Sequence, residues 1–498
     1  MSSPLFMGLD VGTSGVKAIL VDETGEVRAS ATTPLELDTP HPGWAEQHPE
    51  AWWQATIAAI HAVLGQQPAE TVAGIGISGQ MHSSVFLDAS GAVIRPALLW
   101  CDGRTTAECA EITEKAGGEG KLKEWVSNPA LEGFTLPKVL WLRNHEPAAY
   151  ERLATVMLAK DFIRYRLTGA IATEPSDASG TLMFDPVGMR WSEPLLQAVG
   201  LSPSLLPPVG GSAEVLGRST AQVTALTGLP SGTPVVGGGA DNACGAAGVG
   251  VVSAGEAVAS WGTSGTVLAP TAQPHVDPGL RAHTFCHVLP DVWYVMGVML
   301  TAGGAFQWYR DQLARDVAGR PDATLRLNEE AEAVARGADG VVFLPYLQGE
   351  RTPHRDAAMR GAFLGLSAAH TRAHLSRAVL EGICFGLRDS LSILQQLGLA
   401  PDHLLLTGGG AKSPFVRRLL AEIFGLPVQR VNREEGGAYG AALLAAVGAG
   451  AFPDVPAAAR ATLERTPLEH PEPAAVEAYQ GLYRQFQGCY AAGRLPAG

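Results

Sequence analysis

The sequence predicts an α/β protein built from two related halves, and three observations support this fold class. The chain has 498 residues, more than one ordinary core requires. Its composition, 46% hydrophobic and 17% charged, is typical of a well-buried globular protein. The tetrapeptide Gly-Thr-Ser-Gly occurs at residues 12–15 and again at residues 262–265, once in each half, and both copies lie between apolar, strand-like runs.

The first half is expected to open with an antiparallel meander, followed by a helix and a buried strand. The helix is predicted over residues 52–64 because Trp53, Ile57, Ile60 and Leu64 recur on one helical face. Meander, helix and strand in this order open an α/β domain. The predicted strands cover residues 5–9, 16–22, 27–37 and 72–78.

The second half repeats this order around the second tetrapeptide. The expected elements are strands at residues 257–261, 266–269 and 404–407, a long helix at residues 374–397 and a last helix at residues 474–491. We place the domain change within the Ala- and Gly-rich residues 245–255. This gives an N-terminal domain of residues 1–247 and a C-terminal domain of residues 248–498.

Charge and cysteine content narrow the function. The net charge of −13 argues against a nucleic-acid partner, whose phosphates would be repelled. The six cysteines are scattered without metal-site spacing, so we expect reduced thiols of a cytoplasmic protein. We expect neither a secretory signal nor a membrane span, because no basic stretch precedes an apolar N-terminal run and no apolar run reaches about 18 residues.

Each Gly-Thr-Ser-Gly is expected to form a hairpin turn whose amides converge on one point. Such a concavity suits an anion, and small side chains let the backbone approach it. Two of them in two related halves suggest that one polyphosphate is held from both sides. The alternative is a pair of ordinary hairpin turns. The residues assigned to phosphate binding are Gly12, Thr13, Ser14, Gly262, Thr263 and Ser264.

Asp10 ends the first predicted strand and opens the first of these turns. A carboxylate beside a phosphate is repulsive unless a divalent cation lies between them. Asp10 is therefore the candidate ligand for Mg²⁺, directly or through water. The alternative is a turn aspartate that accepts amide hydrogen bonds.

Asp241 is the candidate general base. An apolar strand runs into three glycines at residues 237–239 and then delivers this acid among small residues. Phosphorylation of an alcohol needs a base that accepts the hydroxyl proton as the phosphoryl group transfers. The alternative is an Asp that caps the following Ala-rich helix. We group the adjacent Asn242 with the substrate-binding residues.

A glycine run and a polar run complete the candidate site. Residues 408–413 link a strand to a helix, with Ser413 expected as the N-cap, and their small residues would let a planar ring such as adenine lie against the backbone. Gly408, Gly409, Gly410, Ala411 and Ser413 are therefore assigned to nucleotide binding, although such a run is often only a turn. Gln80, Met81 and His82 follow a strand, where polar groups suit a neutral sugar; a structural histidine is the alternative for His82.

The motifs together resemble the FGGY family of carbohydrate kinases, within the superfamily of actin, hexokinase and heat-shock ATPases. Residues 133–145 resemble the first family signature, and residues 361–366 with residues 374–381 resemble the second. The resemblance implies two actin-like, ribonuclease H-like ATPase domains with an interdomain cleft. It implies a sugar site on the N-terminal domain and ATP with Mg²⁺ on the C-terminal domain, in an enzyme that could form a homodimer.

Within that family, residues 41–47, 79–82, 100–104 and 349–354 are similar to segments of xylulokinases. This similarity implies transfer of the ATP γ-phosphoryl group to D-xylulose, with Met81 and His82 on the sugar and Asp241 as base. It also implies that Asp10 supports metal and phosphate. Ala159 and residues 434–438 depart from the usual pattern. Another ketose or a polyol remains an alternative acceptor, and a non-catalytic sugar-responsive regulator is the alternative class.

Overall fold

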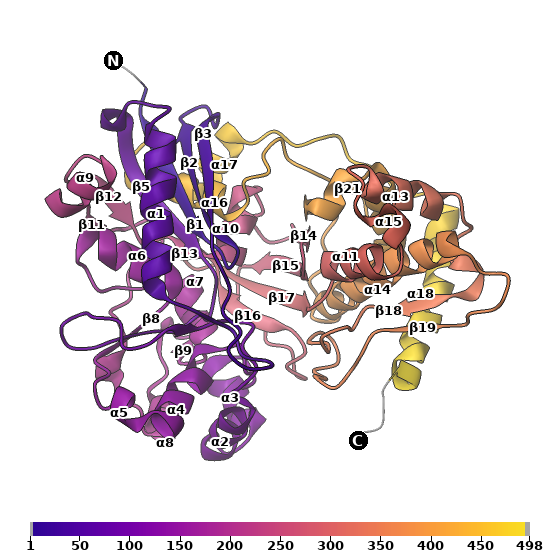
Figure 1. Cartoon of the computed structure of the whole chain (residues 1–498), viewed down its shortest axis with the longest axis horizontal. Coiled ribbons are helices and arrows are strands. Elements are labelled where there is room, and N and C mark those ends of the chain that lie inside the picture. The colour runs from indigo at the N-terminus through magenta and orange to yellow at the C-terminus, as the bar shows by residue number, and fades with distance from the viewer. Residues whose placement is uncertain (1–2, 494–498) are drawn as a thin grey trace.

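Each half of the chain forms its own mixed β-sheet, and the two sheets lie in separate lobes (Figure 1). The computed structural model describes residues 3–493. The first sheet has the order β11-β12-β5-β1-β2-β3 with β13 beside β5, and the second has the order β16-β17-β15-β14-β20-β21. The strands of the first sheet are β1 (Leu5–Val11), β2 (Gly15–Asp22), β3 (Val27–Pro34), β5 (Val72–Gly79), β11 (Val215–Arg218), β12 (Pro234–Val236) and β13 (Gly239–Ala240). Those of the second are β14 (Val258–Trp261), β15 (Gly265–Thr271), β16 (His283–Cys286), β17 (Trp293–Met299), β20 (Leu404–Gly408) and β21 (Val428–Gln429).

The two Gly-Thr-Ser-Gly turns occupy equivalent places in the two sheets. β1 is antiparallel to β2 and parallel to β5, just as β14 is antiparallel to β15 and parallel to β20. The next strand outward is antiparallel in both cases, β3 beside β2 and β17 beside β15. The predicted strands are confirmed, and the two halves share one plan centred on a hairpin.

The first helix, α1 (Pro49–Leu64), is confirmed, but its buried face differs from the predicted one. Ile57 and Leu64 are only half-buried, whereas Trp52, Thr56 and Val63 are fully buried. The predicted stripe left out Trp52 and Val63 as well as the small residues of the buried face. The helix meets β2 and β3 through a face that includes a threonine and alanines, which the apolar pattern does not reveal.

Alternate residues of β1 face opposite sides of the first sheet. Leu9 joins the core cluster formed with α1, whereas Phe6 packs with residues of α16 (Gly437–Gly448) on the other side. A Cβ on Gly8 would collide with a carbonyl of α16, so this glycine lets the helix lie directly on the strand. The same alternation puts Asp10, and its neighbour Ser78 on β5, on the α16 side.

The chain therefore crosses between the lobes more than once. α16 contacts both the first sheet and α10 (Asp241–Gly248), while the last helix, α18 (Pro473–Gly493), packs on α15 (Pro414–Phe424) in the second lobe (Figure 1). The long helix α14 (Arg372–Gln396) and α18 confirm the two helices predicted there. The division at residue 247 stays a prediction. Within residues 3–493, none of the helices has the length and apolar character needed to cross a membrane.

Candidate active site

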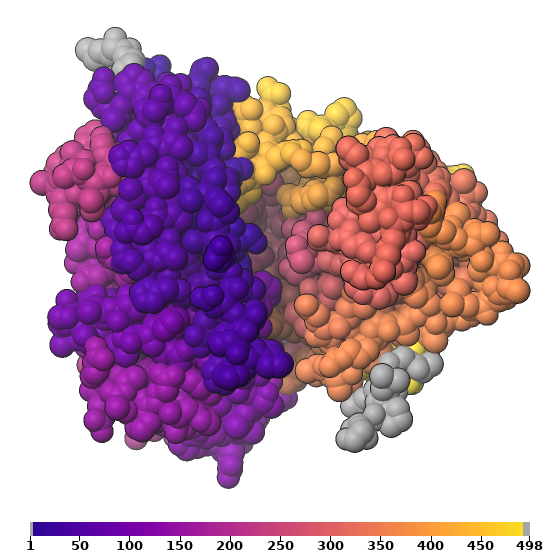
Figure 2. Space-filling view, in the orientation of Figure 1, coloured from indigo at the N-terminus to yellow at the C-terminus, as the bar shows by residue number. Residues whose placement is uncertain are grey.

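The site lies where the ends of the two hairpins approach the hollow between the lobes, which Figure 2 shows between the indigo and the orange parts of the surface. In both turns backbone carbonyl groups accept hydrogen bonds, whereas several backbone amides have no acceptor among the described residues. The Ser14 carbonyl accepts from Leu35 N at 3.0 Å, and the Thr263 carbonyl accepts from Ala302 N and Gly304 N at 2.9 Å each. The amides of residues 13–14 and 262–264 donate no hydrogen bond to the described part of the chain. The two turns thus expose donors suited to an anion.

Thr13 connects the first turn to the residues predicted to bind sugar. Its hydroxyl donates to Gln80 Oε1 at 3.1 Å and accepts from Trp100 Nε1 at 3.0 Å, and its carbonyl accepts from Gln47 Nε2 at 2.8 Å. Gln80 Oε1 also accepts from Ser83 Oγ at 3.1 Å. Gln80 is buried and its amide is committed to this network, so its direct contact with a sugar stays a prediction while its bracing of the turn is observed.

Asp10 faces the first residue of α16. Its Oδ1 atom is buried and has no hydrogen-bond partner among residues 3–493. Burial raises the pKa of this carboxyl, against the opposing influence of Ser78 and Lys17. A Cβ added to Gly437 would lie 2.6 Å from Ser78 Oγ and 3.2 Å from Asp10 Oδ1. The absence of a side chain at Gly437 therefore keeps space beside an unsatisfied carboxylate oxygen.

Strand β13, which pairs with β5 on the side away from β1, brings Asp241 to the same edge of the sheet as Asp10. β13 runs parallel to β5, with Ala240 opposite Gly79, so the next residue lies beside Gln80 and its neighbour Met81. The bend before β13 requires Gly238, whose φ is +77° and whose Cβ would collide with the Ile77 carbonyl. The parallel strands β1, β5 and β13 thus deliver both candidate acids at one edge of the sheet.

The Asp241 carboxylate is poised between its charged and neutral forms. Burial, and then the charge of Asp10, raise its pKa to about 7, although Asn242 opposes the shift. Oδ1 accepts from Asn242 N at 2.7 Å and from Asn242 Nδ2 at 2.9 Å. Asp241 is the first residue of α10 and Ala240 is the N-cap, so the helix-capping alternative is not what the structure has. The Asn242 amide also lies 3.7 Å from Met81 Sδ, which joins the predicted sugar residues to the base.

His82 is held in an unusual backbone conformation, with φ of +68°. Its Nδ1 atom is hydrogen-bonded to the Gly180 carbonyl, and its ring packs edge-on against Phe134 with centroids 4.8 Å apart. Burial, followed by the charge of Lys138, lowers the pKa of His82 to about 3, so the ring is neutral. Because a carbonyl can only accept, Nδ1 carries the hydrogen and Nε2 is an acceptor.

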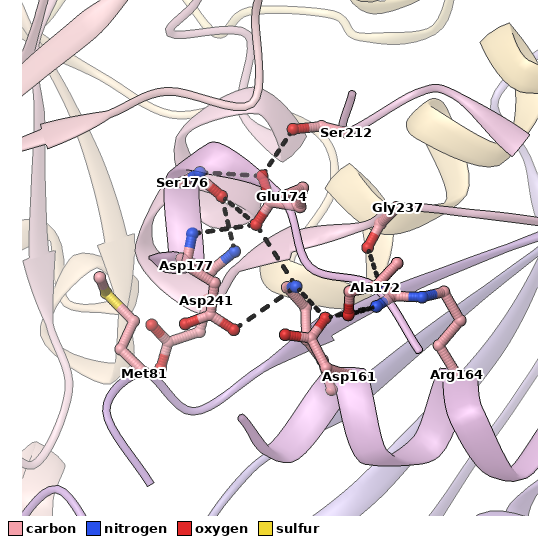
Figure 3. Close-up of polar contacts among 12 residues, drawn as sticks. Met81, Asp161, Arg164, Ala172, Glu174, Ser176, Asp177, Ser212, Gly237 and Asp241 are labelled. Carbon is pink, nitrogen blue, oxygen red and sulfur yellow. Dashed lines mark hydrogen bonds and ion pairs between the residues drawn. The ribbon is translucent and has the colours of Figure 1, made fainter. Parts of the chain in front are cut away.

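A buried group of charged residues, which sequence reasoning missed, holds the segment that carries Asp241 (Figure 3). Lys160 Nζ lies 2.7 Å from Asp161 Oδ1 and 3.4 Å from Glu174 Oε1. Glu174 accepts from Ser176 Oγ at 2.8 Å, and that hydroxyl accepts from Ala240 N at 2.9 Å. The neighbouring Arg164 donates to the Gly237 carbonyl at 2.9 Å. The glycine bend before Asp241 is therefore fixed at both ends.

The loop at residues 408–413 separates two cavities. One, of about 560 Å³, lies between α10, the start of α16 and the second sheet, and Asp241, Asn242 and Ala411 line it. The other, of about 500 Å³, is lined by the second turn, by Gly409, Gly410 and Ser413, and by α11 (Gly303–Gln312). Ser413 caps α15 as predicted and accepts from Asn328 Nδ2 at 3.0 Å. Both cavities have the size of small-molecule sites.

Comparison with known families decides the identity. The N-terminal domain model of the FGGY family of carbohydrate kinases matches residues 5–248, and the C-terminal domain model of that family matches residues 257–449. The chain belongs to the FGGY family of carbohydrate kinases. It is a carbohydrate kinase, and the resemblance noted from its sequence is confirmed.

Several FGGY kinases are similar along nearly the whole chain. The xylulose kinase of Bacillus subtilis is 39% identical, with 97% of this chain and 96% of the relative covered. The xylulose kinase of Escherichia coli is 41% identical, with 89% and 90% covered. The crystal structure of a xylulose kinase from Rhodospirillum rubrum is 33% identical, with a TM-score of 0.90 and 98% of both chains covered. The predicted two-domain α/β kinase fold is confirmed.

The candidate site combines three chemical features. Free turn amides from both lobes can bind phosphate, an unsatisfied buried carboxylate at Asp10 can hold a hard cation, and Asp241 can exchange a proton near neutral pH. The sequence predicted these residues because each lies in a turn or close to the end of an apolar strand. It missed Arg164, Glu174 and Asn328, each of which has at least one partner far away along the chain, namely Gly237, Ser212 and Ser413.

Proposed function

We propose that this kinase transfers the γ-phosphoryl group of ATP to the 5-hydroxyl of D-xylulose, giving D-xylulose 5-phosphate. The similar proteins of Bacillus subtilis and Escherichia coli bear the name xylulose kinase. One observation carries the reaction type: Asp241, whose pKa is raised to about 7, directly follows strand β13. Its neighbour Asn242 contacts Met81, and Asp241 lines a cavity that extends to the nucleotide-side loop. We further propose that the enzyme is cytoplasmic and works with a soluble sugar.

ATP is proposed to place its adenosine in the cavity of about 500 Å³, against Gly409, Gly410 and Ser413. Its phosphates would then lie between the turn at residues 12–14 and the turn at residues 262–264. Because the protein carries a net charge of −13, the phosphate charge has to be offset locally. The free amides of both turns offer donors for that purpose.

Asp10 is the proposed Mg²⁺ ligand, and its surroundings fit a cation. Its buried Oδ1 lacks a partner, and Gly437 leaves space beside it. The residues 3–493 contain no group of three or more His, Cys, Asp or Glu arranged to hold a metal. This agrees with Mg²⁺, which is commonly bound by one or two carboxylates together with substrate phosphates. When bound, the ion would neutralise charge on the phosphates and on Asp10.

The protein residues divide the work on the sugar. Asp241 is proposed to orient the 5-hydroxyl and to accept its proton as the phosphoryl group leaves ATP. Neutral His82 is proposed to accept a hydrogen bond from another hydroxyl at Nε2, while Met81 and Asn242 border the chain of the sugar. Closure of the two lobes would exclude water, which otherwise competes as the phosphoryl acceptor.

A coupled ADP-release assay tests this function. The panel contains D-xylulose, D-ribulose, L-ribulose, L-xylulose, glycerol, gluconate and D-fructose, each with ATP and Mg²⁺. We expect turnover per KM on D-xylulose to exceed every other acceptor at least tenfold. A different preferred sugar would retain the kinase and overturn the acceptor. Absence of any sugar-stimulated turnover would instead favour a sugar-responsive regulator.

A further inference from the structure

Arg351 of the second lobe is held rigidly against the first lobe. The neighbouring Thr352 donates its amide to the Val298 carbonyl at 3.0 Å and accepts from Val298 N at its hydroxyl at 2.9 Å. Glu350 Oε1 accepts from Leu300 N at 3.1 Å. These bonds fix the loop to the end of β17. From there Arg351 Nη2 reaches to 3.0 Å from the position that a Cβ on Gly133 would occupy.

The Arg351 guanidinium has no hydrogen-bond or ion-pair partner among residues 3–493. Burial lowers its pKa from an ordinary value that is far above neutral, and the nearby carboxylates of Glu132 and Glu350 oppose that shift without pairing with it. Arg351 is half-buried, and a partly desolvated guanidinium is more stable when its donors find acceptors. The arrangement therefore favours a ligand that supplies acceptors.

Two backbone carbonyls in this part of the first lobe already accept hydrogen bonds from Lys138. The carbonyls of Gly133 and His82 both accept from Lys138 Nζ, at 2.6 Å and 3.1 Å. Phe134, which follows Gly133, packs against the His82 ring. Arg351 thus lies close to Gly133 and the His82 ring packs on the next residue, Phe134, so both side chains adjoin one short segment of the first lobe.

We propose that Arg351 binds the carbonyl end of the sugar and is a specificity-determining residue; this inference rests on the proposed ketose kinase function. A ketone oxygen accepts hydrogen bonds only, which suits a donor-only guanidinium, while the adjacent hydroxyl can donate to His82. The hydroxyl at the other end of the sugar is then at Asp241, with Met81 between them. Since Arg351 belongs to the second lobe, the bound sugar touches both lobes.

The test compares Arg351→Met and Arg351→Lys with the wild type. Arg360→Met, an exposed arginine nine positions further on that bonds only to carbonyls of its own loop, is the matched control. Because hydrogen bonds to charged groups are strong, Arg351→Met should raise KM for the preferred ketose at least tenfold while KM for ATP changes less than twofold. Arg351→Lys keeps the positive charge but loses the planar guanidinium with its several donors. Its KM for the ketose should therefore lie between those of the wild type and Arg351→Met. The control should match the wild type.

A second measurement separates recognition of the carbonyl from general sugar binding. Tryptophan fluorescence gives the Kd of D-xylulose and of xylitol, the polyol without the carbonyl. We expect Arg351→Met to weaken D-xylulose binding several times more than xylitol binding. Equal losses for both, or an unchanged KM in a variant with wild-type circular dichroism, overturns the assignment. A wild type that prefers a non-ketose acceptor overturns the proposed function instead, and the two failures are thereby distinguished.

Discussion

Replacing Asp241 with Asn should stabilise the ligand-free protein at pH 8 while removing its activity. In the folded protein burial and the charge of Asp10 raise the pKa of Asp241 to about 7, from an ordinary value of 3.8. The charged carboxylate is therefore an unfavourable feature of the fold, retained for its chemistry. Asparagine has the same shape and no charge, so the variant removes the penalty and the base together.

The sign and size of the effect follow from proton linkage. The folded state holds its proton up to about pH 7 and the unfolded state only to about pH 4, so stability falls as pH rises through this interval. Each unit of pKa shift corresponds to about 1.4 kcal/mol. Integrated between pH 5 and pH 8, the single group costs the wild type about 3 kcal/mol. The variant lacks this dependence at position 241.

Urea unfolding followed by tryptophan fluorescence measures this difference without nucleotide or Mg²⁺. The quantity is the free energy of unfolding of Asp241→Asn minus that of the wild type, at pH 5 and at pH 8. From pH 5 to pH 8 this difference should shift by about 3 kcal/mol in favour of the variant. The control variant Asp402→Asn, at an exposed position, should show no such shift. A difference that varies by less than about 1 kcal/mol refutes the raised pKa. Turnover should fall at least about 100-fold, and a variant that keeps more than a tenth is evidence against the base.

Three further predictions concern the metal, the water reaction and the nucleotide. Gly437→Ala would place a methyl group 2.6 Å from Ser78 Oγ and 3.2 Å from Asp10 Oδ1. The Mg²⁺ concentration that gives half-maximal activity should therefore rise several-fold. An unchanged Mg²⁺ titration would contradict this prediction. The wild type should hydrolyse ATP slowly without sugar, and a rate equal to that of buffer alone, in a preparation with good sugar turnover, argues against it. Ser413→Ala removes a helix cap and the bond to Asn328, so unfolding should become easier by about 1 kcal/mol and KM for ATP should rise, which chemical denaturation and initial rates measure.

Local patterns carried most of the fold prediction. The strands around both turns, the helix that becomes α14 and the cap at Ser413 depend on residues close together in the chain, and all are confirmed. Asp10 and Asp241 were predicted as candidates because each follows an apolar run and lies near glycines. The positions of these two acids at one sheet edge follow from parallel pairing on both sides of β5, which the sequence did not specify.

Long-range contacts account for what was not predicted. The return of α16 onto the first sheet depends on glycines whose role appears only when a helix lies on them, such as Gly8. The buried Lys160 and Arg164 lie on a short helix, α6 (Ala159–Thr168), whose charges would ordinarily indicate a solvated face. Their partners are Glu174 and the carbonyl of Gly237, distant in sequence. The pairing of distant residues has no periodic signal along the chain.

The shared sheet edge also links the two acids chemically. Asp10 raises the pKa of Asp241 because two carboxylates near each other disfavour a second charge. Under the proposed function, a cation held by Asp10 would offset this repulsion and lower the pKa of Asp241. The base would then be charged mainly when metal and nucleotide are in place, and more of it would remain protonated when they are absent. The alternation that puts Asp10 on the α16 face of β1 thus places it where a bound cation would couple nucleotide binding to readiness of the base.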